Sequence, residues 1–150
     1  MDLLMVGLLA LHLLAAVAWV GGIFFAYMAL RPASMLLDAP LRLGLWAATF
    51  GRFFPWVWGF IVVLLVSGHA LMSQWPATAG LMAMAVIGWM MSLLFAYLYF
   101  VLFKSLKLAV AASDTPAAAQ AMKRIRPVMA TNLALGMAAS AIGALHPILG

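Results

Sequence analysis

The stretch Leu11-His12-Leu13-Leu14-Ala15-Ala16-Val17-Ala18-Trp19-Val20-Gly21-Gly22 decides the fold, because it lies in an apolar run without charge from Leu3 to Leu30. About 28 residues at ~1.5 Å each make a helix of roughly 42 Å, longer than the ~30 Å hydrocarbon core of a bilayer. The run therefore predicts a transmembrane helix that is tilted or extends past one interface. A histidine inside such a helix is costly unless it has a partner or a function.

The composition excludes a water-soluble domain. The chain has 150 residues, of which 69% are hydrophobic and 7% charged, whereas soluble domains carry about 25% charged residues. It contains no cysteine, and its carboxylates are three aspartates. Thiolate sites are therefore absent, and little general acid–base chemistry is possible beyond three histidines. This composition favours a role other than catalysis, without deciding the question.

Four apolar segments are long enough to span a membrane, at residues 3–30, 54–73, 80–103 and 127–145. They predict an all-α, polytopic membrane protein: one four-helix transmembrane domain over residues 1–150. Short interfacial helices are expected in the connections, over Ser34–Leu37 and Leu41–Phe50 with a break at Pro40, and over Ala117–Arg126.

The basic residues predict the orientation. All eight lysines and arginines lie in the first and third connections: Arg31, Arg42, Arg52, Lys104, Lys107, Lys123, Arg124 and Arg126. The positive-inside rule places both connections in the cytoplasm. Both termini and the turn at Gln74–Ala79 then face outward, toward the periplasm if the membrane is a bacterial inner membrane. Topology explains the net charge of +5, so no nucleic-acid partner is expected.

The fourth apolar segment has a face of small and polar residues. At ~100° per residue, Asn132, Gly136, Gly143 and His146 fall within about 80° of one another. Small residues let helix backbones approach closely, and an intramembrane asparagine usually bonds a neighbouring helix. We therefore expect Asn132, Gly136 and Gly143 to serve helix packing.

All three histidines fall in the outer half of the predicted bundle. His12 lies roughly 13 Å and His69 roughly 9 Å below the outer surface, and His146 lies at the outer end of the fourth span. Imidazole with thioether sulfur suits copper, so the predicted metal ligands are His12, His69 and His146, with Met5, Met72, Met82 and Met84 as further donors. Alternatively, His12 and His69 are axial ligands of a haem b that Trp19 flanks. The plainer alternative is that each histidine bonds a backbone carbonyl or reaches the headgroups.

The chain resembles the copper resistance protein D (CopD) family. The similar stretches are residues 11–22 and Leu30-Arg31-Pro32, then Arg52-Phe53-Phe54-Pro55-Trp56-Val57-Trp58 and Ser67-Gly68, then Tyr99-Phe100, Lys104-Ser105-Leu106-Lys107, Ile125-Arg126 and Asn132-Leu133-Ala134-Leu135-Gly136. The resemblance implies an inner-membrane protein of copper uptake or tolerance, beside a periplasmic copper carrier. Longer members have eight helices, so a four-helix unit would form a transport path as a homo-oligomer. The first helix is also similar to that of HemJ-type protoporphyrinogen oxidases, which bind haem b.

Three functions therefore stay open: copper binding or movement, a b-type haem protein of electron transfer or porphyrin oxidation, and a structural accessory subunit. Haem propionates usually need a basic partner, and the outer half of the chain has no lysine or arginine. This absence favours copper over haem.

Overall fold

The computed structural model describes the backbone of residues 2–149 and the side chains of residues 2–145. Within them, every regular element is helical: α1 (Leu3–Phe25), η1 (Ala26–Leu30), α2 (Arg31–Ser34), α3 (Ala39–Met72), α4 (Ala79–Tyr97), η2 (Leu98–Phe103), α5 (Lys104–Ala111) and α6 (Thr115–Leu149). The η elements are π-helical turns that join their neighbours into continuous helices. Four helices are thereby long and apolar enough to cross a membrane, which confirms the predicted all-α four-helix architecture.

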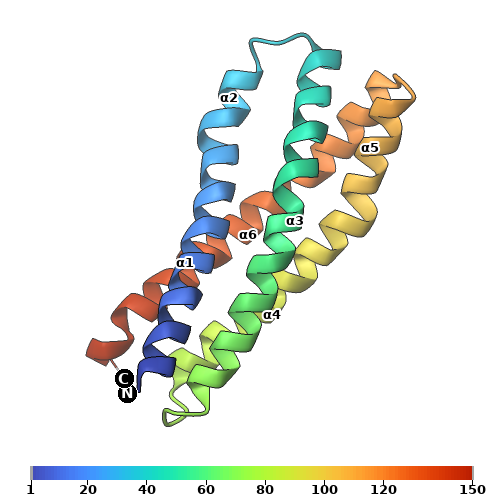
Figure 1. The fold of residues 1–150 in the computed structure, drawn as a ribbon. Coiled ribbons are helices and arrows are strands. Elements are labelled where there is room, and N and C mark those ends of the chain that lie inside the picture. Colours follow the sequence, from blue (N-terminus) through green and yellow to red (C-terminus); the bar gives the residue numbers. More distant parts are fainter. Residues whose placement is uncertain (1, 150) are drawn as a thin grey trace.

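The four long helices run up and down (Figure 1). The start of α1, the end of α6 and the α3–α4 loop lie at one end of the bundle, here called the terminal end. The α2–α3 and α5–α6 connections lie at the opposite end. Since every lysine and arginine falls within residues 31–52 or 104–126, we call this opposite end the basic end. Helix α1 packs mainly on α3, and α4 packs mainly on α6.

The predicted interfacial helix Leu41–Phe50 is not separate from the second span, because both belong to α3. Pro40 lies in the first turn of α3, where a missing N–H costs nothing, and Pro55 lies inside the helix. The helix continues through Pro55 because buried side chains keep a spacing of three and four residues across it: Leu43, Trp46, Phe50, Phe54, Val57 and Ile61.

The predicted helix Ala117–Arg126 likewise continues into the fourth span as α6. Its buried positions also keep one spacing through Pro127: Ala118, Met122, Ile125, Met129, Asn132 and Gly136. The third span extends past its predicted end at Phe103 to Ala111. In this extension Lys104 and Lys107 are exposed, while Leu106 between them is buried. Residues Met35–Asp38 form the connection where a short helix Ser34–Leu37 was predicted.

Stacked aromatic rings form the centre of the bundle. The Phe50 and Phe54 rings of α3 are nearly parallel, with centroids 4.8 Å apart. Phe54 also meets Phe95 of α4 and Phe103 of η2 edge to face, at 5.1 and 4.9 Å. Trp19 of α1 packs on Phe95 from the other side, at 6.3 Å. These contacts join three of the four helices through one continuous core.

Large side chains fill the space above three glycines. A Cβ atom at Gly22 would overlap the Phe53 ring. One at Gly136 would lie 2.6 Å from Val20 Cγ2, and one at Gly143 would lie 3.1 Å from Met84 Cε. Each glycine therefore lets a side chain of another helix approach its backbone.

We expect Gly136→Ala to destabilise the protein by ~1–3 kcal/mol, because its methyl group overlaps the stiff, β-branched Val20. The matched control is Gly59→Ala in α3, where an added Cβ meets nothing within 4 Å. That control should be neutral or gain up to ~1 kcal/mol. Thermal unfolding in one detergent measures both, and a Gly136→Ala midpoint at or above wild type would contradict the packing argument.

Candidate functional site

His12 is half-buried where α1 packs on α3. Its Nδ1 lies 2.8 Å from Ser67 Oγ. The Ser67 hydroxyl has one proton, which it donates to the carbonyl of Val63. Ser67 Oγ therefore accepts from His12 Nδ1–H, and the second ring nitrogen, Nε2, carries the lone pair of the neutral imidazole.

Gly68 makes room for this ring. A Cβ at position 68 would lie 3.2 Å from His12 Cε1, closer than ordinary contact. The pair Ser67-Gly68 thus supplies both an acceptor for Nδ1 and the space beside Cε1. The ring is held by an oriented hydrogen bond and a close backbone contact, which is the arrangement that fixes ligand histidines in metal sites.

His69 follows Gly68 directly on α3, and its neighbours differ from those of His12. Its Nδ1 donates to the carbonyl of Leu65 at 2.7 Å, so its Nε2 also carries the lone pair. The side chain is exposed, and the ring meets Trp89 of α4 edge to face at 6.1 Å. His12 therefore approaches α3 from α1, while His69 contacts α4.

Among the described residues, no three His, Cys, Asp or Glu side chains come together as a metal group. The side chain of His146, the third predicted histidine ligand, lies outside the described residues. Within the described part of the chain, a metal at His12 would therefore have at most one further ligand of these four types.

The four predicted methionine donors have different surroundings. Met72 follows Gly68 by four residues, so it shares the face of α3 that meets His12, about 6 Å toward the terminal end. Met5 precedes His12 by two turns of α1. Met82 is exposed, and Met84 packs on Gly143. Met72 is thus the best-placed thioether.

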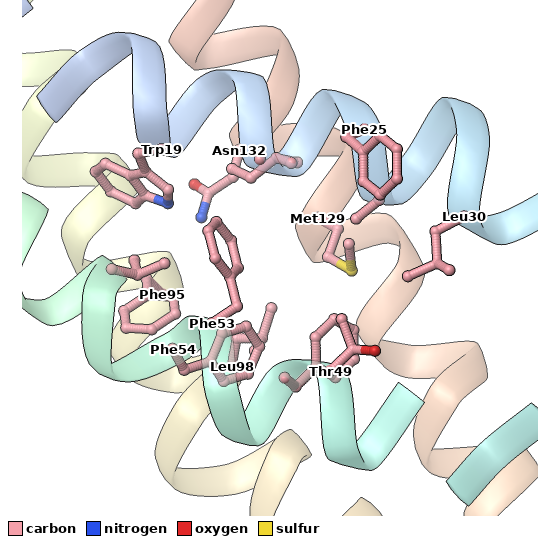
Figure 2. Close-up of a pocket in the computed structure, with 15 residues that line it drawn as sticks. Trp19, Phe25, Leu30, Thr49, Phe53, Phe54, Phe95, Leu98, Met129 and Asn132 are labelled. Atoms are coloured by element: carbon pink, nitrogen blue, oxygen red, sulfur yellow. The ribbon is translucent and has the colours of Figure 1, made fainter. Parts of the chain in front are cut away.

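A cavity of about 170 Å³ lies deeper in the bundle. Figure 2 shows the side chains around it, with Asn132 directed inward from α6. Asn132 is 2% exposed, and its Oδ1 has no hydrogen-bond partner among the described residues. The rest of the lining is almost entirely apolar, including Trp19, Phe53 and Met129. A buried carbonyl oxygen without a partner costs ~1–3 kcal/mol.

This cavity is small for a large organic ligand. Pockets for such ligands usually measure ~300–1,000 Å³, well above its volume. Trp19, the predicted haem neighbour, packs on Phe95 and forms part of the cavity wall, whereas His12 and His69, the predicted axial ligands, are not among the lining residues.

Comparisons of the chain with protein-family models, curated proteins and solved structures gave no match. The sequence argument did not assign Ser67 as the partner of His12. The sequence does contain one signal for this contact, because Ser67 and Gly68 lie at the predicted depth of His12. The serine can accept a hydrogen bond from a histidine, and the glycine leaves room for its ring.

We expect Asn132→Leu to raise the thermal midpoint, because leucine removes a buried amide oxygen without a hydrogen-bond partner and fills part of the cavity. A gain of ~1 kcal/mol is the expected size. Ala134→Leu, at an exposed position of the same helix, controls for the added leucine. A lower midpoint for Asn132→Leu alone would show that the amide has a stabilising partner.

Proposed function

We propose that this chain is a copper-binding membrane protein and that His12 is its central ligand. The observation that carries the proposal is the His12–Ser67 hydrogen bond, 2.8 Å long, within an apolar helix contact. This bond occupies Nδ1 and leaves the Nε2 lone pair for a metal ion. An intramembrane histidine is retained at a cost, which a bound ion would offset.

The donor chemistry favours copper. The chain has no cysteine. Its three aspartates are Asp2, Asp38 and Asp114, and none of them lies in residues 60–72, beside Ser67 and Gly68, or in residues 74–113. Imidazole with thioether sulfur then remains, a set that suits Cu(I) better than hard cations. Met72 is the proposed second ligand because it follows Gly68 on the same face of α3. His69, His146, Met5, Met82 and Met84 are further candidates for additional ions or for ion transfer.

The resemblance to the CopD family supports the same proposal. Residues from its separate stretches meet in the structure: His12 contacts Ser67-Gly68, and Phe53 fills the space above Gly22. On this proposal the membrane is a bacterial inner membrane and the terminal end faces the periplasm, where a copper carrier would deliver or receive the ion. The basic end faces the cytoplasm, in accord with the positive-inside rule.

A haem b is less well supported at this site. The terminal end carries no lysine or arginine that could pair with propionates. A structural accessory role would leave His12 as a purely packing residue. Metal binding distinguishes these proposals directly.

We expect purified wild-type protein to bind Cu(I) and His12→Ala to lose most of that binding, because Nε2 of His12 is the central donor. Copper content after loading under reducing conditions, with competition by a coloured Cu(I) chelator, measures the change. His69→Ala removes an exposed imidazole in another environment and should keep the site. Equal copper content in wild type and His12→Ala would reject it. A Soret band after haem-replete expression would favour haem instead.

Ser67→Ala should weaken Cu(I) binding by roughly 10-fold while keeping the ligands, since second-shell partners of ligand histidines contribute about 10–100-fold in affinity. Ser92→Ala is the matched control: it is a buried serine of α4 whose hydroxyl bonds Gly88 in its own helix. If both serine variants bind Cu(I) as wild type does, Ser67 does not position the ligand.

A further inference from the structure

A second polar site lies at the basic end of the bundle, far from His12. Three arginines from three elements surround a pocket of about 50 Å³: Arg31 of α2, Arg42 of α3 and Arg126 of α6. Ser34 and Trp46 also line it. We call this group the arginine pocket. Its volume is enough for a small anionic group or a few waters.

Arg126 has an unused donor inside the protein. Its Nε is buried and has no hydrogen-bond partner among the described residues. The other polar groups of the pocket are engaged: Ser34 Oγ donates to the carbonyl of Arg31 and accepts from Trp46 Nε1. One Nη of Arg42 donates to the carbonyl of Leu37. A charged, buried donor without a partner is costly, so a bound acceptor would stabilise this site.

No carboxylate lines the arginine pocket. Asp38 lies in the α2–α3 connection but not among the lining residues, and Asp114 accepts from the backbone N–H of Ala117 at the start of α6. Asp2 caps α1 at the terminal end. Three arginines thus line one pocket without an anionic side chain among its lining residues. The Arg31 guanidinium lies over the Tyr27 ring, 5.0 Å from its centroid, which leaves its charge without an anionic partner, so the positive charge of the pocket favours binding of an anion from outside.

The depth of the site matches that of lipid phosphates. Arg126 precedes Leu145 by 19 residues, or about 29 Å along α6, close to the ~30 Å hydrocarbon thickness. Arg31 follows directly on the apolar run of the first span. We therefore expect the arginines at the level of the headgroups on the basic side.

We propose that the arginine pocket binds a phosphate group, supplied by an anionic phospholipid of the surrounding leaflet. Guanidinium groups recognise phosphate oxygens through paired N–H donors, and basic pockets between transmembrane helices are a known form of lipid-headgroup site. The bound phosphate would accept from Arg126 Nε and bridge α2, α3 and α6. This proposal is independent of copper binding.

The test uses the full chain, purified and delipidated in a sugar detergent. Phosphatidylglycerol, phosphatidylcholine and inorganic phosphate are each added, and native mass spectrometry and the thermal midpoint report binding. Phosphatidylglycerol should bind and raise the midpoint, with about tenfold lower affinity in Arg126→Gln and in Arg42→Gln. Arg52→Gln is the matched control, because it removes one positive charge at the same end from an exposed residue outside the pocket.

The outcomes distinguish a lipid headgroup from a free anion as the source of the bound phosphate. An arginine-dependent rise with inorganic phosphate as large as with the lipid would support the phosphate site but assign it to a free anion. Equal binding of both lipids, equal loss in Arg52→Gln and Arg126→Gln, or no loss in either pocket variant would overturn the proposal. If Arg126→Gln does not fold, Arg42→Gln decides, since the hydrogen bond that Arg42 makes to the Leu37 carbonyl is exposed.

Discussion

Close approach between helices is the constraint on which this bundle depends. Lipid tails are as apolar as leucine, so burial of apolar surface does not hold transmembrane helices together; packing does. Glycines meet this need at several contacts, with Phe53 over Gly22, Val20 over Gly136 and Met84 over Gly143. The same device holds His12 against Gly68. The candidate metal ligand is thus held by the same kind of contact that assembles the fold.

Much of the fold could be predicted because membrane spans depend on length and apolarity, which are local properties. Four spans in an all-α bundle followed from these properties alone. The helix ends did not, because the starts predicted at Phe54 and Pro127 lie inside α3 and α6. The signal that outweighs them is the unbroken spacing of buried residues from Leu43 to Ile61 and from Ala118 to Gly136. Prolines are tolerated where neighbouring helices hold both sides of the turn.

The candidate site could be predicted in depth but not in lateral position. Counting along each span placed His12 and His69 at similar levels. It could not show that α1 packs on α3, so Ser67 was not identified as the partner of His12. Adjacent helix positions differ by ~100°, which is why Gly68 meets His12 while His69 contacts Trp89. The arginines of the basic end illustrate the same limit: the sequence assigns them to two separate connections, and only the fold brings Arg31, Arg42 and Arg126 to one pocket.

The π-helical turn η1 sets the rotational phase of everything that follows it in the first span. One extra residue in a turn rotates the downstream side chains by about 100° relative to an uninterrupted α-helix. Ala26 and Leu30 of η1 border the apolar cavity, and Arg31 is the next residue. The direction in which the Arg31 side chain leaves the helix therefore depends on the π-helical geometry of the five residues of η1. Wound as an ordinary α-helix, the same five residues would carry Arg31 about 100° around the helix axis, away from its place in the arginine pocket.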